Sequence, residues 1–560
     1  MSSLHHLSIL FLSLATSFAL YANSIKGEFV FDDVFFYPRQ ELRDWKYLPR
    51  LFLEPAARPT SPKDAEIYRP LANVTFSLNF ILFGESTTSF HLVTIVLNGI
   101  VTYLIFLTTY KMFNNFTLSV ISTALFAFFP IHTENVAAIK PRDEILSTMF
   151  ALSGWLALFK FTRTNRMLWV VASAFLFSLG FFCKEFSLVY PFLTLTALAF
   201  TRKISRPQSI KFLACLTPGM TIFIALWIHV LGRNIITNLH TFPSNPIAYA
   251  SLPTRVWTAG KIAFVYISKT FFPVNLSATY RYNHLPLVTN PLRSPASFIG
   301  LTLLAALGLL AIHPRTRSTP LGIGSLIMLI SYFPFSKFLS VKGEYVAERW
   351  MYFPSIGLAA IGAYLLSLLF QRSKITTAAI LILVLAIYSR TTFARNHVWL
   401  SDKALYTSMT EDAPDAMFGH LSLGRYYLAK NDYELARPHV LRAMEIYSNH
   451  PDVLDAYAGL MFHDKNYSEA KIAIEQSISI YPAPAQSHYF YALILAKMGR
   501  YQASLDITFD RLTPSISRPE IRFLTAVNYY RLNQPIEAEK YFDFNPKLPY
   551  AEKIRAISEF

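Results

Sequence analysis

Two adjacent carboxylates, Asp32 and Asp33, are the residues in this sequence with the clearest chemical potential. They lie in the segment GEFVFDDVFF, shortly after the first apolar stretch of the chain. Adjacent carboxylates repel each other, so the pKa of one member is expected to rise into the range useful for proton transfer. The same pair is also compatible with a solvated turn, and alone it is a weak signal.

Other charged residues stand at the ends of later apolar stretches. Arg69, in the segment YRPL, is either a lipid-headgroup anchor or a phosphate ligand. Ionised groups near membrane depth are paired or functional. Six more residues of this kind are Glu134, Arg142, Lys184, Glu185, Glu348 and Arg349. Such a set suits acid–base chemistry on an anionic substrate embedded in a bilayer.

A metal site is not predicted from these residues. His132 and Glu134 are two positions apart, a spacing that does not align their side chains on one face of a helix. Acid–base chemistry by carboxylates and cations of this kind requires no metal ion or other cofactor.

The elements that must position these side chains are membrane helices. Of the 560 residues, 53% are hydrophobic and only 15% are charged, against about 25% charged in ordinary globular proteins. Apolar stretches long enough to cross a hydrocarbon core of ~30 Å recur along the first 400 residues. We predict eleven spans, at residues 6–22, 90–110, 116–131, 144–160, 167–183, 186–201, 212–232, 297–313, 319–337, 350–370 and 375–390.

The charge distribution predicts the orientation of these spans. The net charge is +16, yet residues 401–560 contain 17 basic and 20 acidic residues, so the positive excess lies in the loops of the first part. If residues 255–273 do not cross the membrane, twelve basic residues and no acidic ones fall in the loops of one side. Short basic loops mark the cytoplasmic side. The N-terminus is then cytoplasmic, and residues 24–88 and the C-terminal part are extracytoplasmic.

This pattern also argues against a nucleic-acid partner, since a nucleic-acid surface would be a basic stripe on a folded soluble face.

The C-terminal part, residues 401–560, is a repeat array with a period of 34 residues. Tyrosines recur at 433, 467 and 501. Small residues keep the same step at two positions: Gly424, Ala458, Ala492 and Ala526, and again Ala436, Ala470, Ser504 and Ala538. Paired helices that pack closely need small residues at such fixed positions. The pattern resembles four tetratricopeptide repeats over residues 415–547, which form a solenoid with a concave groove for peptides.

Seven segments in order resemble the membrane glycosyltransferases that carry tetratricopeptide repeats, which include eukaryotic O-mannosyltransferases and bacterial relatives. These segments are FVFDD, YRPLANVTFSLNF, FHLVTIVLNGIV, FFPIHTENVAAIKPRDEILS, KEFSLVYP, FFPVNLSATYRYNHLPLV and ERWMYFPSIGL. The resemblance implies an all-α C-type glycosyltransferase fold over residues 1–400 and a polyprenyl-phosphate-linked sugar donor. The chain departs from the family in the second outer loop, where it has Lys140-Pro141-Arg142 and the family usually has Gly-Arg. The segment that begins TFPSNPIAY looks closer to bacterial members, which favours a bacterial cytoplasmic membrane over the endoplasmic reticulum.

The resemblance and the charged residues together give a hypothesis of inverting sugar transfer to a hydroxyl, that of a protein Ser or Thr, at the extracytoplasmic face. Asp32 or Asp33 would take the proton of the acceptor, with a preference for Asp32 that comes from related enzymes. The cations Arg69, Lys184 and Arg349 would stabilise the phosphate leaving group. Glu134, Arg142, Glu185 and Glu348 would orient the acceptor or those cations, and the repeats would hold the polypeptide.

Two other classes compete with this hypothesis. One is a non-catalytic membrane scaffold whose repeats recruit envelope proteins. The other is a transporter, but transporters place polar residues near the midplane of broken helices, whereas these carboxylates gather at one face.

Overall fold

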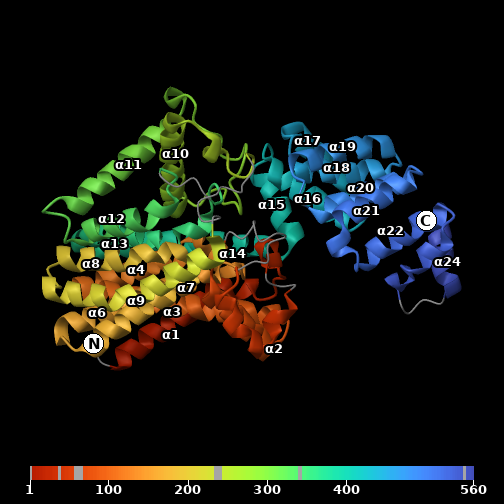
Figure 1. Ribbon diagram of the computed structural model, residues 1–560. Helices are drawn as coiled ribbons and strands as arrows, with labels where there is room; N and C mark the ends of the chain where they lie inside the picture. The colour runs from red at the N-terminus through yellow and green to blue at the C-terminus, as the bar shows by residue number, and fades with distance from the viewer. Residues whose placement is uncertain are drawn as a thin grey trace. The chain divides into compact units, whose positions relative to one another are not determined.

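The computed structural model is all-α, as the sequence predicts (Figure 1). It describes residues 3–35, 39–55, 67–232, 242–338, 343–482, 484–545 and 550–560. The chain divides into two compact units, residues 1–408 and 409–560, and the division falls within helix α15 (Asp402–Asp412). Each unit is described by itself below.

The first unit is a bundle of apolar helices joined by loops and 3-10 turns. Neighbours in the bundle include the pairs α1/α3, α3/α6, α6/α7, α7/α9 and α4/α13 (Figure 1). The α-helices are α1 (Ser3–Tyr21), α2 (Pro70–Phe83), α3 (Thr87–Phe113), α4 (Phe116–Phe128), α5 (Thr133–Ala137), α6 (Arg142–Thr164), α7 (Met167–Cys183), α8 (Tyr190–Phe200), α9 (Arg206–Leu231), α10 (Leu252–Phe271), α11 (Pro295–Ile312), α12 (Pro320–Tyr332), α13 (Pro354–Arg372) and α14 (Lys374–Asn396).

Short 3-10 helices occupy much of the remaining described chain of this unit. They are Ala22–Ser24, Phe31–Phe35, Gln40–Arg43, Trp45–Phe52, Pro130–His132, Glu185–Val189, Pro246–Tyr249, Pro291–Arg293, Phe333–Phe335, Glu348–Met351 and His397–Leu400.

All eleven predicted spans fall on apolar helices. Within the described residues, seven helices are long and apolar enough to cross a membrane, and the bent pair α4–α5 is an eighth candidate. The spans predicted at 167–183, 186–201 and 319–337 fall on shorter apolar helices. Helix α10, which carries Lys261 and Lys269, is not among the candidates. The protein is an integral membrane protein with multiple spans.

Glycines let two pairs of these helices approach closely. A Cβ atom at Gly300 of α11 would lie 1.9 Å from the carbonyl oxygen of Gly260 in α10. A Cβ atom at Gly357 of α13 would lie 2.3 Å from the carbonyl oxygen of Gly324 in α12. Because lipid tails are as apolar as leucine, membrane helices associate through such close packing rather than through hydrophobicity. These contacts fix α11 on α10 and α13 on α12.

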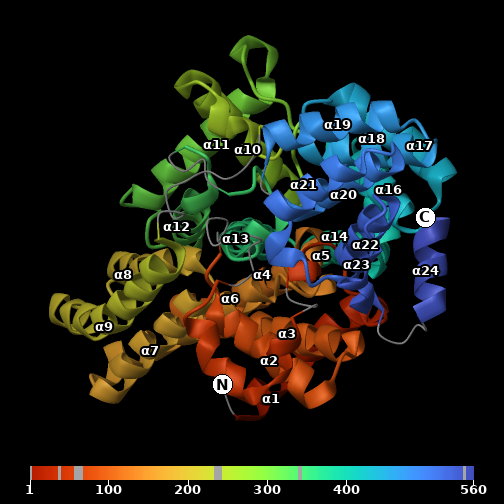
Figure 2. The same ribbon diagram turned by 45° about the vertical axis from the view of Figure 1, so that its right-hand side comes forward.

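The second unit is an array of paired antiparallel helices (Figure 2). The pairs are α16/α17, α18/α19, α20/α21 and α22/α23, followed by α24 (Tyr550–Glu559). Their bounds are Met417–Ala429 and Tyr433–Ile446, Pro451–His463 and Tyr467–Ile480, Ala485–Lys497 and Tyr501–Arg511, and Pro519–Arg531 and Pro535–Glu539. A final 3-10 turn covers Phe542–Phe544.

The 34-residue register predicted from the sequence coincides with these pairs. The three tyrosines at the period are the first residues of α17, α19 and α21. All eight small residues of the register are buried. At Gly424, an added Cβ would lie 2.8 Å from the Val440 side chain of the paired helix. The small residues are therefore where the two helices of a repeat meet, and the predicted all-α repeat fold of this unit is confirmed.

Candidate active site

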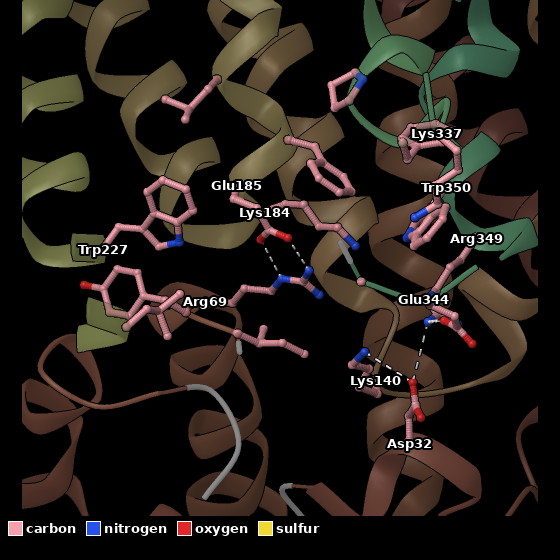
Figure 3. Close-up of a pocket in the computed structure, with 18 of the residues that line it drawn as sticks. Asp32, Arg69, Lys140, Lys184, Glu185, Trp227, Lys337, Glu344, Arg349 and Trp350 are labelled. Carbon is pink, nitrogen blue, oxygen red and sulfur yellow. Dashed lines mark hydrogen bonds and ion pairs between the residues drawn. The ribbon is translucent and has the colours of Figure 1, made fainter. Parts of the chain in front are cut away.

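A cavity of about 420 Å³ in the first unit gathers charged residues from five separate loops. Its lining residues include six cations and three carboxylates. The cations are Arg69, Lys140, Lys184, Arg281, Lys337 and Arg349, and the carboxylates are Asp32, Glu185 and Glu344. In Figure 3, Trp227 lies at one end, Asp32 and Arg349 at the other, and Arg69 between them.

Aromatic and aliphatic side chains line much of the cavity. They are Ile67, Tyr68, Phe186, Leu188, Trp227, Leu231, Pro334 and Phe335, of which Phe186 and Phe335 contact the ring of Trp350. Trp227 and Leu231 come from α9, a helix that buries few of its apolar side chains within the protein. This wall suits an apolar chain that enters beside α9 from the membrane, with its polar end among the cations.

Asp32 and Asp33 have different environments, although they are adjacent. They lie in the 3-10 turn Phe31–Phe35. Asp33 is 1% exposed, and its carboxylate accepts hydrogen bonds from the backbone N–H groups of Val30 (2.9 Å) and Lys140 (2.8 Å). Asp32 instead lines the cavity, and its Oδ2 lies 3.3 Å from Lys140 Nζ and 3.8 Å from an Arg349 nitrogen. Asp33 therefore ties two loops together, while Asp32 presents its carboxylate to the cavity.

The charges around the pair separate the two pKa values. Burial raises the pKa of Asp33 to about 7, against the opposing effect of its two backbone hydrogen bonds. Burial also raises the pKa of Asp32, but the positive charges of Lys140, Arg349 and Arg281 outweigh it and hold the pKa below its ordinary value. At neutral pH, Asp32 is therefore an ionised carboxylate facing the cavity.

Arg349 is held in a fixed position by two carboxylates. Its guanidinium donates to Glu134 and to Glu344, and its backbone N–H donates to Glu134 Oε2 at 3.2 Å. Glu134 is 2% exposed and is not a lining residue. Arg281 lies 3.5 Å from Glu344. The predicted role of Glu134 in orienting a cation therefore fits its place behind Arg349.

Arg69 and Lys184 form a second cluster with three carboxylates. Arg69 donates to both oxygens of Glu185, at 2.7 and 3.0 Å, and to Asp143 at 2.6 Å. Lys184 Nζ lies 2.5 Å from Glu144 and 3.7 Å from Asp143. Asp143 and Glu144 occupy the first turn of α6, where the helix dipole favours negative charge. These pairs balance the charge of both cations.

Four predicted residues do not line the cavity: Asp33 and Glu134, described above, and Arg142 and Glu348. Arg142 is fully buried and donates to Asn79 (2.7 Å), Thr94 (3.1 Å) and the Phe90 carbonyl (2.9 Å), so it joins α6 to α2 and α3. Glu348 accepts hydrogen bonds from the Ser277 backbone (2.8 Å) and from Tyr280. Adjacent residues in a turn point in different directions, which is why Arg349 reaches the cavity and Glu348 does not.

Sequence reasoning missed Lys140, Arg281, Lys337 and Glu344. The signal for Lys140 was present, since it stands two residues before Arg142 in the same motif. Lys337 is the last residue of the span predicted at 319–337, and in the structure it follows the turn Phe333–Phe335 that ends this apolar segment. Burial lowers the pKa of Lys337 to about 7, and its ammonium lies 5.2 Å from the centre of the Trp350 ring.

No group of three or more His, Cys, Asp or Glu side chains in the described part of the chain is arranged to hold a metal ion.

Residues 65–229 match the family model described as dolichyl-phosphate-mannose-protein mannosyltransferase. Among curated proteins, the chain is 26% identical to human protein O-mannosyl-transferase TMTC3, over 94% of this chain and 67% of that protein. It is also 26% identical to human protein O-mannosyl-transferase TMTC1, over 81% of this chain and 56% of that protein. The chain thus spans between about half and two thirds of the length of these relatives. The chain is similar in sequence to protein O-mannosyltransferases.

Solved structures show more distant likenesses. ArnT from Cupriavidus metallidurans, bound to undecaprenyl phosphate, is 12% identical with a TM-score of 0.41, over 98% of this chain and 89% of that one. PilF from Pseudomonas aeruginosa is 19% identical with a TM-score of 0.24, over 28% of this chain and 75% of that one. The preference for bacterial members of the family stays a prediction.

Proposed function

We propose that this protein is a membrane glycosyltransferase that moves a sugar from a polyprenyl-phosphate donor to the hydroxyl of a protein Ser or Thr. The single observation that carries the proposal is the cavity, which combines an apolar wall, six cations and, at Asp32, an ionised carboxylate. A polyprenyl chain, a phosphate and an acceptor hydroxyl need these three environments in this order. The match of residues 65–229 supports mannose as the sugar.

In this reaction Asp32 acts as the general base. The acceptor oxygen attacks the anomeric carbon of the sugar and gives its proton to Asp32. The bond between that carbon and the phosphate oxygen breaks, and its electron pair leaves with the polyprenyl phosphate. Attack opposite to the leaving group inverts the anomeric configuration. A phosphate leaves without protonation, so the cations of the cavity need only stabilise its developing charge.

The predicted phosphate cations contribute differently to this step. Arg69, Lys184 and Arg349 are already bound by carboxylates, so they present fixed hydrogen-bond donors with little freedom to move. Glu185 fixes Arg69, and Glu134 fixes Arg349. Fixed charges of this kind stabilise a transition state without reorganising during the reaction.

The loops that form the cavity support the proposed orientation. They follow the first, third, fifth, seventh and ninth predicted spans, so an odd number of crossings precedes each of them. They would not share one side of the membrane if α10 were an additional crossing before the loops of Arg281 and Arg349. With basic loops in the cytoplasm, the cavity and the repeat unit are extracytoplasmic. A bacterial cytoplasmic membrane remains our proposal for the location.

The repeat unit is proposed to bind the polypeptide acceptor. Tetratricopeptide arrays present a concave surface to peptides, and residues 417–539 form four helix pairs of that kind. Membrane lipids are the other partner, around the apolar helices of the first unit.

Glycopeptides from cells with and without the gene provide the test, with an Asp32→Asn gene as a third arm. We expect specific Ser or Thr glycopeptides to disappear without the gene and to stay absent with the Asp32→Asn gene. The competing function is a membrane scaffold that recruits proteins through its repeats. A scaffold would keep its phenotype in the Asp32→Asn strain, and unchanged glycopeptides in all three strains would contradict the proposal.

A further inference from the structure

Lys140 contacts both carboxylates of the acidic pair with different parts of the residue. Its backbone N–H donates to Asp33 Oδ1 at 2.8 Å, and its side-chain ammonium donates to Asp32 Oδ2 at 3.3 Å. The first contact fixes the loop between α5 and α6 and does not depend on the side chain. The second contact places a cation directly on the proposed base, inside the cavity (Figure 3).

Arg349 and Lys184 differ from Lys140 in the number of carboxylates that bind them. Arg349 is bound by Glu134 and Glu344, and Lys184 by Glu144 and Asp143. These carboxylates hold their cations in place when a ligand arrives. In the described part of the chain, the ion pair found for Lys140 is with Asp32 alone. An ammonium on a flexible four-carbon stem can also change partners more easily than a guanidinium held by two carboxylates.

We propose that Lys140 is an exchange residue, whose ammonium moves from Asp32 to the donor phosphate when the donor binds. This inference rests on the proposed function. In the empty cavity the ammonium covers Oδ2 of Asp32. With donor bound, the phosphate competes for the ammonium, and Oδ2 becomes available to the acceptor hydroxyl. After transfer, the same ammonium neutralises the charge that forms on the leaving phosphate.

This arrangement makes donor binding a condition for base activity. A carboxylate paired with a cation is a weaker base, and the positive charge of Lys140 is among those that lower the pKa of Asp32. When the donor phosphate takes Lys140 away from Asp32, the basicity of Asp32 rises. Without a donor, Lys140 stays on Asp32 and its basicity stays low. The other charged groups around Asp32 are Arg349, Arg281 and the neighbouring Asp33, and Arg349 remains bound by Glu134 and Glu344 throughout.

The exchange predicts a specific coupling between two substitutions in a binding experiment that does not depend on transfer. Replacing Asp32 by Asn releases Lys140 in advance, so the ammonium no longer has to leave a carboxylate to reach the phosphate. We expect Asp32→Asn to tighten binding of a polyprenyl phosphate by about fivefold, a coupling of the size found between contacting residues. In a Lys140→Met chain the same change is expected to alter binding by less than about twofold.

The measurement uses the full chain in lipid nanodiscs with undecaprenyl phosphate as the probe. It compares the unchanged chain, Asp32→Asn, Lys140→Met and the double variant. Lys140→Met keeps the backbone contact with Asp33, so the loop is expected to stay folded, and thermal melting checks this. Lys140→Arg, alone and together with Asp32→Asn, is the matched control, because it keeps the charge and is expected to retain the coupling.

A fivefold effect of Asp32→Asn in the unchanged and Lys140→Arg backgrounds, lost in the Lys140→Met background, supports the exchange. Equal tightening in all backgrounds would mean that Asp32 acts only by general repulsion of the anion, and would overturn the role of Lys140 while the proposed function stands. No binding of the probe by any of these proteins would overturn the donor site itself.

Discussion

Ion pairs in the two units of this protein lie in opposite environments. In the membrane unit, the side chains of Arg69 and Asp143 are 9% and 4% exposed. In the repeat unit, those of Arg437 and Asp464 are 32% and 31% exposed. Burying a charge costs several kcal/mol, and apolar residues of similar size are often as stable in the same place. Charges that stay buried around a cavity therefore indicate a site, whereas the surface pairs of the repeats indicate little beyond solubility.

The largest effect is expected at Asp32, the member of the acidic pair that lines the cavity. Asp32→Asn keeps the size of the side chain and removes its ability to accept a proton, so transfer should fall by ~10²–10⁴-fold, the range of a general base. Single-turnover transfer with purified protein measures this. Asp33→Asn is the matched control. It loses one backbone hydrogen bond, so it is expected to lower the melting temperature and to leave most of the transfer rate. Full activity of Asp32→Asn would show that this carboxylate is structural.

Breaking a buried pair should cost stability. Arg69→Ala leaves Asp143 and Glu185 without their guanidinium in a buried environment, for which we expect a loss of about 3–5 kcal/mol. The yield of monodisperse protein and its melting temperature in detergent report this loss. A variant as stable as the unchanged chain would mean that water enters the cavity and solvates both carboxylates.

The pH dependence of the rate distinguishes the two adjacent carboxylates. The pKa of Asp33 is raised to about 7 by burial, so a base at Asp33 would lose activity as the pH falls through 7. The pKa of Asp32 is held below its ordinary value by Lys140, Arg349 and Arg281, in spite of burial, so it stays ionised at lower pH. The value of kcat/KM for the donor reports the protonation state of the free enzyme. We expect titration of the base to cause no fall in kcat/KM between pH ~7 and ~5. A tenfold fall per unit there would assign the base to Asp33.

Lys337 should give a smaller effect on the alkaline side. Burial lowers its pKa to about 7, so its positive charge is lost as the pH rises through 7. Donor binding should weaken by roughly threefold to tenfold between pH ~6 and ~8.5, as expected for the loss of one charge contact. Lys337→Arg keeps the charge at every pH and is expected to remove this dependence. An unchanged profile in that variant would place the titrating group elsewhere.

The smallest effect is expected at the surface of the repeat unit. Arg437→Ala removes a pair in which two nitrogens contact Asp464 at 2.7 and 3.0 Å. Because both side chains are solvated, we expect a loss of about 1 kcal/mol or less. The melting temperature of the full-length variant checks this. A loss as large as that of Arg69→Ala would contradict the contrast between the two units.

The helices of this protein, and the loops that carry its charges, could be predicted from the sequence alone. Apolar length and the 34-residue register are local properties, and both have direct physical causes: the thickness of a bilayer and the close packing of paired helices. The sequence also allowed five residues that line the cavity to be named, because ionised residues at the ends of apolar spans are unusual. They are Asp32, Arg69, Lys184, Glu185 and Arg349.

Which of these charges face the cavity depends on the tertiary structure. Asp32 and Asp33, or Glu348 and Arg349, are neighbours in a turn, and the direction of each side chain depends on contacts with segments more than seventy residues away. Lys140 lines the cavity and Arg142 does not. Arg142 instead donates hydrogen bonds to α2 and α3, at Asn79, Thr94 and the Phe90 carbonyl. The sequence gives the types of the charged residues and their order. Which ion pairs they form, and therefore the pKa and the exposure to the cavity of a particular carboxylate, depends on how the folded loops pack together.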